Sequence, residues 1–197
     1  MQLQDCVFRT RERSTWVATV DLDERIYVIE DTTISQFIRS SAKRNYGELR
    51  FRCRWVLRYH EIPNDAKTWR LDGSYIPMAK WHNTSQVAPV NHTTKSIIQP
   101  IQVESMGVHQ VLRFLPGAHV HLVPPEQAVI RQDTNFISLQ ILGKNCFYRH
   151  YRIIEGWTNF LKEAETFGSF EYTEVASNKL QALNDSVTRK ISQIFNI

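Results

Sequence analysis

Cysteine, glycine-rich loops and long hydrophobic runs are all scarce or missing in this 197-residue sequence. Its three cysteines, Cys6, Cys53 and Cys146, are widely spaced and form no CxxC pair, so neither a disulfide framework nor a structural zinc site is predicted. Its 7 glycines are not clustered, which excludes the common phosphate-binding loops. No apolar run approaches a membrane span. Residues 1–13 are charged and lack the apolar segment of a secretory signal. We therefore expect an intracellular protein, in cytoplasm or nucleus, that is not secreted and has no transmembrane segment.

Common catalytic signatures are also missing. There is no GxSxG nucleophile elbow, and no cysteine lies in a recognisable catalytic context. These absences favour a binding or assembly protein over an enzyme, with no catalytic residues and no cofactor.

What the chain does have is the composition of a folded, basic protein. Hydrophobic residues make up 42% and charged residues 22%, and the 10 Phe, 7 Tyr and 5 Trp can fill a sizeable core. The formal charge is +4. This excess permits contact with nucleic acid or an anionic membrane without requiring either.

Hydrophobic periodicity predicts an α+β fold: a single domain over 1–197, mainly antiparallel sheet, packed with a helix in the N-terminal half and with C-terminal helices. Thr33 followed by Gln36 matches a capping box and begins the first helix. Proline-punctuated residues 63–103 are expected to form a long irregular excursion. The predicted helices span 33–45, 157–167 and 177–196, and the predicted strands 16–22, 26–29, 48–60, 108–115, 118–123, 136–142, 146–154 and 170–175. Seven aromatic side chains are predicted to be largely buried: Trp16, Phe37, Phe51, Trp55, Trp157, Phe160 and Phe167.

The strand predicted at 48–60 has an apolar face and an arginine face. Side chains on one strand face recur about every 6.5–7 Å, near the phosphate spacing of a nucleic-acid strand, and arginine forks suit phosphate oxygens. The alternative is that these arginines pair with carboxylates and are structural. The predicted site for nucleic acid or another anionic surface comprises Lys43, Arg44, Arg50, Arg52, Arg54 and Arg58.

A histidine pair gives a second candidate site. His119 and His121, followed by Glu126, match the HxHxxxxE core of the cupin metal motif and could chelate one metal from a strand. The glycines of that motif are missing, because Arg113 and Asp133 occupy their positions. We therefore predict no bound metal, and a cupin-like metal enzyme remains an alternative.

The last predicted helix carries an apolar stripe. Such a stripe most often packs on the protein's own sheet, but it could also dock another subunit. The possible self-association residues are Leu180, Leu183, Val187, Ile191 and Ile194.

The order of predicted elements resembles that of rhabdovirus matrix proteins. The stretch from Trp157 to Ser177, WTNFLKEAETFGSFEYTEVAS, is similar to that family's late segment of an aromatic residue, a helix, Phe-Gly and a strand. The resemblance implies a non-enzymatic viral structural protein in virion assembly, which self-associates and contacts nucleocapsid and anionic membrane, without a small-molecule substrate. The alternative is an RNA-binding viral accessory protein, such as a silencing suppressor or movement protein.

Overall fold

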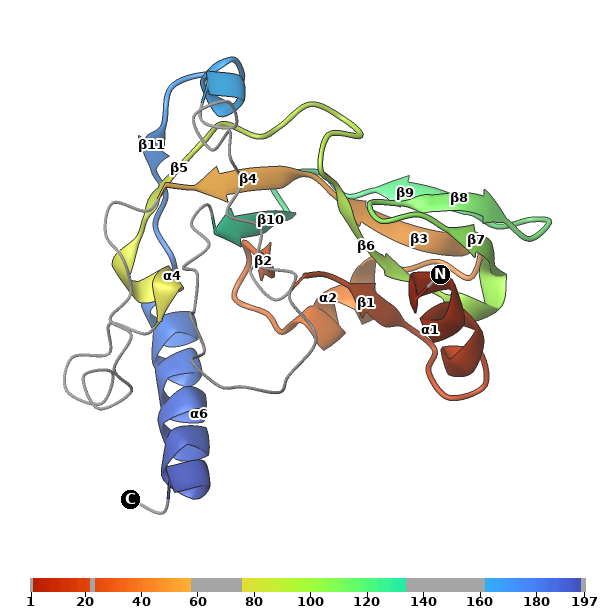
Figure 1. The fold of residues 1–197 in the computed structure, drawn as a ribbon, viewed down its shortest axis with the longest axis horizontal. Helices are drawn as coiled ribbons and strands as arrows, with labels where there is room; N and C mark the ends of the chain where they lie inside the picture. Colours follow the sequence, from red (N-terminus) through yellow and green to blue (C-terminus); the bar gives the residue numbers. More distant parts are fainter. Residues whose placement is uncertain (1, 22–23, 58–75, 134–161, 196–197) are drawn as a thin grey trace, which may run out of the picture. The chain divides into compact units, whose positions relative to one another are not determined.

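A computed structural model describes residues 2–21, 24–57, 76–133 and 162–195 (Figure 1). The chain divides into two compact units, one of residues 1–54 and 87–132, the other of residues 55–86 and 133–197. The boundary falls inside strand β4 (Cys53–Val56). The α+β class is confirmed, with mainly antiparallel strands and helices toward both ends, whereas one domain over 1–197 stays a prediction.

A four-stranded sheet organises the first unit. Its strand order is β1-β6-β3-β9; β6 pairs antiparallel with β1 and β3, and β9 pairs parallel with β3. A second antiparallel pair joins β2 to β10, and β7 and β8 form a hairpin. The bounds are α1 (Gln2–Thr10), β1 (Val17–Thr19), β2 (Glu24–Val28), α2 (Ile34–Ser41), β3 (Tyr46–Phe51), β6 (Lys95–Ile98), η1 (Pro100–Gln102), β7 (Val103–Met106), β8 (Val111–Phe114), β9 (His119–Leu122) and β10 (Ala128–Asp133).

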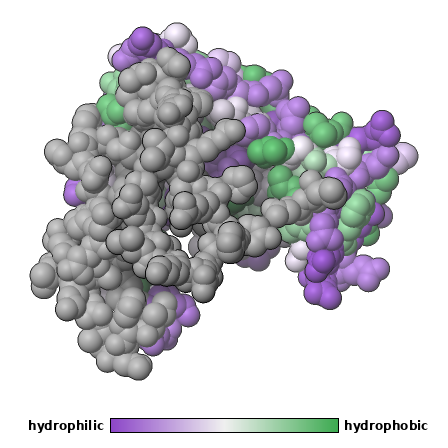
Figure 2. Space-filling view, in the orientation of Figure 1, coloured by the Kyte–Doolittle hydropathy of each residue, from purple (hydrophilic) through white to green (hydrophobic). Residues whose placement is uncertain are grey.

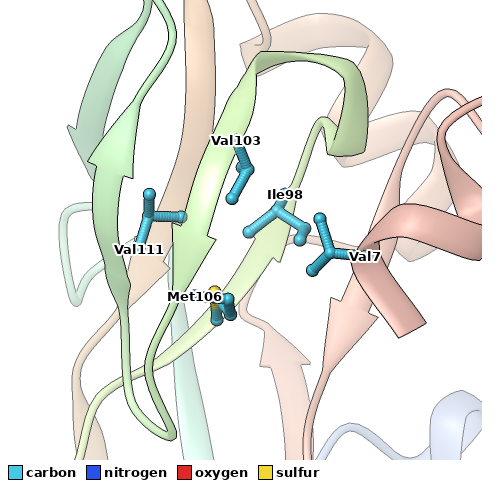
Figure 3. Packing of buried hydrophobic residues seen from close by; sticks show 5 residues of the cluster. All are labelled: Val7, Ile98, Val103, Met106 and Val111. Carbon is cyan, nitrogen blue, oxygen red and sulfur yellow. The ribbon is translucent and has the colours of Figure 1, made fainter. Parts of the chain in front are cut away.

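Helix α1 packs on the β7–β8 hairpin and on the end of β6. The side chain of Gln4 donates to the carbonyl of Glu104 and accepts from the N–H of Met106. These bonds hold the apolar side of α1 over a small cluster of buried residues: Val7, Ile98, Val103, Met106 and Val111 (Figure 3). No helix was predicted at residues 2–10, so α1 is an addition.

Helix α2 shows how closely a local signal can fix an element. The Thr33 side chain accepts from the backbone of Gln36, and the Gln36 side chain accepts from the backbone of Thr33, which confirms the predicted capping box. The helix ends earlier than predicted because Ala42 is extended, with φ −79° and ψ 135°. Its Phe37 is buried, with a ring centroid 6.2 Å from that of Phe51.

The long strand predicted at 48–60 is interrupted, and its last residues, 58–60, lie outside the described part of the chain. β3 ends at Phe51 and β4 starts at Cys53, because the carbonyl of Arg52 accepts from the N–H of Ile130 and its side chain turns to the carbonyl of Ala88. The excursion predicted at 63–103 also proves partly regular: its last third contains β6, a central strand of the sheet.

The second unit contains β5 (Asn83–Thr84), paired with β4 and with β11 (Glu171–Tyr172), and the helices α4 (Pro77–Lys80) and α6 (Ser177–Phe195). Trp55 is buried, and its ring centroid lies 6.1 Å from that of Phe167. The predicted burial of Phe37, Phe51 and Trp55 is confirmed. Trp16 and Phe167 are half-buried. The predicted strands at 136–142 and 146–154, with Trp157 and Phe160, lie outside the described residues.

Among the described residues, the helices include none with the length and apolar character needed to cross a membrane. Cys6 and Cys53 are free thiols. Figure 2 shows hydrophobic and hydrophilic residues interspersed over the coloured part of the surface, and apolar residues such as Leu112 are exposed on the β7–β8 hairpin.

Candidate active site

A charged cluster forms where β1 ends and β2 begins. Register places Thr19 opposite Ser96, so Asp21 and the neighbouring Lys95 meet at this edge. The Nζ atom of Lys95 lies 2.7 Å from Oδ2 of Asp21 and 3.4 Å from Oε2 of Glu24. The same Oε2 accepts a hydrogen bond from the Asp21 N–H at 2.8 Å. The ammonium and the two carboxylates are therefore held as one group.

Burial divides this cluster into a support and an accessible group. The side chains of Lys95 and Glu24 are 2% and 1% exposed, whereas that of Asp21 is 63% exposed. Burying an ammonium and a carboxylate costs several kcal/mol each before their attraction is counted. A pair of this kind is weak evidence for stability, but it fixes the Asp21 carboxylate in one place. Asp21 therefore presents oxygen atoms to solvent from a rigid base.

His109 adds an imidazole beside the cluster, from the turn between β7 and β8. Partial burial, followed by the charge of Lys95, lowers the pKa of His109 below 6.5, while Asp21 and the Thr94 backbone oppose the shift. Thr94 fixes this turn through Oγ1, which donates to the carbonyl of His109 at 2.9 Å. The imidazole is thus mainly neutral at pH 7 and can accept a proton.

Of the predicted arginine face, Arg50 is placed quite differently from the expectation. It is buried, and its Nε and Nη2 atoms donate to the two oxygens of Glu48 at 3.0 and 2.8 Å. Glu48 also accepts from Ser96 Oγ. A shared exposed face is therefore wrong for Arg50, because β3 is covered on both sides and the carboxylate two residues away on the same face neutralises the guanidinium. At this position the arginine pairs with a carboxylate, as the structural alternative supposed.

The other members of the face are dispersed. Nε of Arg52 donates to the carbonyl of Ala88 at 2.7 Å. Arg54 is half-buried, and Arg58 lies outside the described residues. Lys43 and Arg44, in contrast, are exposed, and both line an open pocket with a volume of about 600 Å³ beside α2. The full lining is Thr15, Trp16, Ser35, Ile38, Arg39, Ala42, Lys43, Arg44 and Gln99.

The predicted histidine pair lies against an aromatic ring. Tyr46 stacks on His121 with centroids 4.6 Å apart and meets His119 edge-on at 5.3 Å. Among the described residues no three His, Cys, Asp or Glu side chains are grouped to hold a metal ion, so His119, His121 and Glu126 are not brought together as ligands; the expectation of no bound metal stays a prediction.

On α6, Leu180, Leu183 and Val187 are half-buried. A self-association role for these three residues, with Ile191 and Ile194, stays a prediction.

Comparison with known proteins gives the class. The family model of glycosyltransferase family 92 matches residues 1–183, and the chain belongs to that family. No curated protein sequence matches it. The match spans both compact units and includes the whole charged cluster.

Family membership corrects several expectations. The resemblance to rhabdovirus matrix proteins is wrong, and so are the viral, structural, non-enzymatic and RNA-binding readings and the cupin-like alternative. A glycosyltransferase is an enzyme that acts on sugar donors and acceptors, so the expectation of a nucleocapsid partner and of no small-molecule substrate is also wrong. The matrix resemblance rested on the order of the predicted elements and on local similarity over about twenty residues, which is not a specific motif.

The charged cluster was missed for identifiable reasons. Asp21 was placed in the strand predicted at 16–22 and Glu24 in the turn after it, and Lys95 fell inside the supposed irregular excursion. The available signal was a run of acidic residues at the end of a strand, Asp-Leu-Asp-Glu at 21–24, together with one lysine at the start of a Ser-Ile-Ile strand. That the lysine and the acids meet depends on a strand pairing across 77 residues of sequence, which no local pattern reveals.

Proposed function

We propose that this chain transfers a sugar from an activated donor to a hydroxyl group of an acceptor, and that Asp21 contacts substrate at the reaction centre. Family membership supports the reaction class. The observation that carries the site is the exposed Asp21 carboxylate, held by a lysine and a glutamate that are almost fully buried.

The chemistry of the transfer matches this cluster. The bond between the anomeric carbon and the leaving group breaks, a bond to the acceptor oxygen forms, and the acceptor proton must leave. Glycosyl transition states carry positive charge on the sugar. Two carboxylates and one ammonium leave one negative charge in excess here, which stabilises that positive charge. Carboxylate oxygens also accept hydrogen bonds from sugar hydroxyls.

The roles follow from exposure. Asp21 is the group that reaches substrate, and Glu24 and Lys95 are positioning residues. His109, neutral at pH 7, is proposed to accept the acceptor proton, since a base with a pKa near or below the working pH is free to do so.

The test compares two exposed aspartates. Asp21→Asn should lower the release of leaving group from a panel of sugar nucleotides, with saccharide acceptors, by about 100-fold or more. Asp5→Asn is the matched control, because Asp5 is 60% exposed and also bonded to a cation, Arg9. Asp5→Asn should melt within about 2 °C of the parent, since exposed substitutions change stability by about 0.5 kcal/mol or less. Asp21→Asn removes the nearer counter-charge of the buried Lys95 and should melt lower, so the activities are compared at a temperature at which both variants are folded. Full activity in Asp21→Asn would refute the proposed site.

An intracellular location also remains our proposal. The free thiols of Cys6 and Cys53 support a reducing compartment. The chain carries glycosylation sequons at Asn83, Asn91 and Asn184. Made in eukaryotic cells without an added signal, it should show no mass change on endoglycosidase treatment; a loss of glycan mass would place it in the secretory pathway.

A further inference from the structure

The pocket beside α2 has the form of a ligand site separate from the charged cluster. Ser35, Ile38, Arg39 and Ala42 follow one another at helical spacing, so one face of α2 makes one wall. The residues just before β1, including Trp16, belong to the lining as well. A volume of about 600 Å³ lies within the roughly 300–1,000 Å³ typical of small-molecule pockets.

The charge of this pocket is entirely positive. Arg39, Lys43 and Arg44 line it, and none of its lining residues is acidic. Among the described residues no carboxylate forms an ion pair with any of the three. Cations at a helix end are stabilised by the helix dipole, but that effect is confined to the last turn, and Arg44 lies three residues beyond the end of α2. The helix dipole therefore does not account for all three cations of the pocket.

Hydrogen bonds from Gln102 hold the pocket wall at Arg44 and Gln99. Nε2 of Gln102 donates to the carbonyl of Arg44 at 2.6 Å and to Oε1 of Gln99 at 3.1 Å. No described residue accepts a hydrogen bond from Ser35 Oγ or Trp16 Nε1 in the protein, so these donors are available to a ligand. Cations, hydroxyl groups and an amphipathic ring together suit an anionic sugar better than a purely inorganic anion.

The position of the pocket distinguishes the two substrates of a sugar transfer. Trp16 lies just before β1 and Asp21 two residues after it, so five residues, at most roughly 16 Å of extended chain, separate them. The leaving group of a donor is bonded to the reacting carbon and must lie beside the reaction centre. A charged unit of an acceptor saccharide can lie this far from the hydroxyl that reacts.

We propose that the α2 pocket binds a carboxylated, sulfated or phosphorylated sugar unit of the acceptor, through Arg39, Lys43 and Arg44 with Trp16 against the sugar ring. The sugar class rests on the proposed function. Binding energy from such a remote unit holds the reacting hydroxyl in place and selects acidic acceptors over neutral ones.

Equilibrium binding tests this pocket without relying on catalysis. Calorimetry measures the binding of three probes: a glucuronate-containing oligosaccharide, its neutral glucose-containing counterpart and a nucleoside diphosphate. The parent chain should bind the acidic oligosaccharide at least tenfold more tightly than the neutral one, and less tightly as salt is raised. The double variant Arg39→Gln with Lys43→Gln should lose this preference, whereas Arg189→Gln with Lys190→Gln, a matched pair of exposed cations on α6, should keep it.

Equal binding of the acidic and neutral oligosaccharides by the parent chain would overturn the proposal. So would an unchanged preference in the Arg39 and Lys43 variant, or displacement of the acidic oligosaccharide by the nucleoside diphosphate, which would assign the pocket to the donor. Asp21→Asn separates this inference from the proposed function: it should keep the preference of the parent for the acidic over the neutral oligosaccharide while losing transfer. Sulfated and phosphorylated counterparts of the same oligosaccharide then rank the three anionic groups.

Discussion

Two groups of basic residues in the first unit lie in opposite environments. Arg50 on β3 is buried; the Nε and Nη2 atoms of its guanidinium donate to the two oxygens of Glu48, and Nη1 donates to Oδ1 of Asn91. Arg39, Lys43 and Arg44 beside α2 are exposed, and no ion pair among the described residues neutralises them. Both groups come from the same basic stretch of sequence. Their difference shows that the sign of the charge alone does not distinguish a structural cation from one that can bind a ligand.

The environments of these two groups of cations differ because β3 is buried. Side-chain alternation correctly indicated that Arg50 and Glu48 share a face of β3. It could not indicate that β6 and β9 flank β3 and that its whole length from residue 47 to 51 is buried. Once that face is covered, a guanidinium must be paired, since an unpaired buried charge is strongly unfavourable.

The same substitution at two positions tests this contrast most directly. Arg50→Gln leaves the Glu48 carboxylate, which is fully buried, without its cation, and should lower the free energy of unfolding by about 3–5 kcal/mol. Arg39→Gln removes an exposed cation that pairs with no described carboxylate, and it should change the free energy of unfolding by less than about 0.5 kcal/mol. Urea denaturation of both variants measures the two values. Equal losses would show that burial does not separate the two groups.

A smaller effect is expected at the bulge where β3 meets β9. Gly47 is buried, and a Cβ atom added there would lie 2.7 Å from Cδ1 of Phe114 and 3.3 Å from Cβ of Ala118. Gly47→Ala should therefore destabilise the chain by about 1–3 kcal/mol through overpacking. In a Phe114→Ala background the same change should cost much less, because the ring that it strikes is gone. Denaturation of the four variants measures this coupling; a cost independent of residue 114 would argue against a closely covered strand.

The sequence predicted those elements whose signals are local. The capping box located α2, and the apolar spacing from Leu180 onward located α6. Long-range pairing accounts for what was missed. Lys95–Ile98 is only four residues long and sits in a polar, proline-containing stretch, yet it is central because β1 and β3 pair on either side of it. The break at Arg52 likewise depends on Ile130, 78 residues away.

The candidate site residues also divide into those that a local pattern predicts and those that only strand pairing brings together. Lys43 and Arg44 could be named because they follow a predictable helix, and the structure adds Arg39 one helical turn earlier. Asp21, Glu24 and Lys95 could not be joined, because their meeting depends on the β1–β6 register. A functional site made by strand pairing is thus harder to find than one made by a single helix face.

The smallest predicted effect is a pH dependence of stability that comes from His109. Its folded pKa is lowered below 6.5, first by burial and then by Lys95, with His92 acting in the same direction and Asp21 against it. The unfolded chain titrates near 6.5, so as pH falls through that value the unfolded state gains a proton that the folded state still lacks. The free energy of unfolding should then decrease as pH falls from about 7.5 toward the lowered pKa, and the contribution should vanish above that range.

His109→Gln removes this titration and should flatten the slope of stability against pH between about 7.5 and 5.5. The pKa of His121 is lowered by burial and by Lys43, so His121 contributes to the pH dependence of stability with the same sign. The double variant with His121→Gln should therefore show a flatter slope than His109→Gln alone. Urea midpoints at closely spaced pH values supply the measurement. Because His109 is exposed, solvent screens its charge and the change should be modest. A slope that steepens in His109→Gln would mean that folding favours the charged imidazole, and it would remove His109 as the neutral proton acceptor proposed beside Asp21.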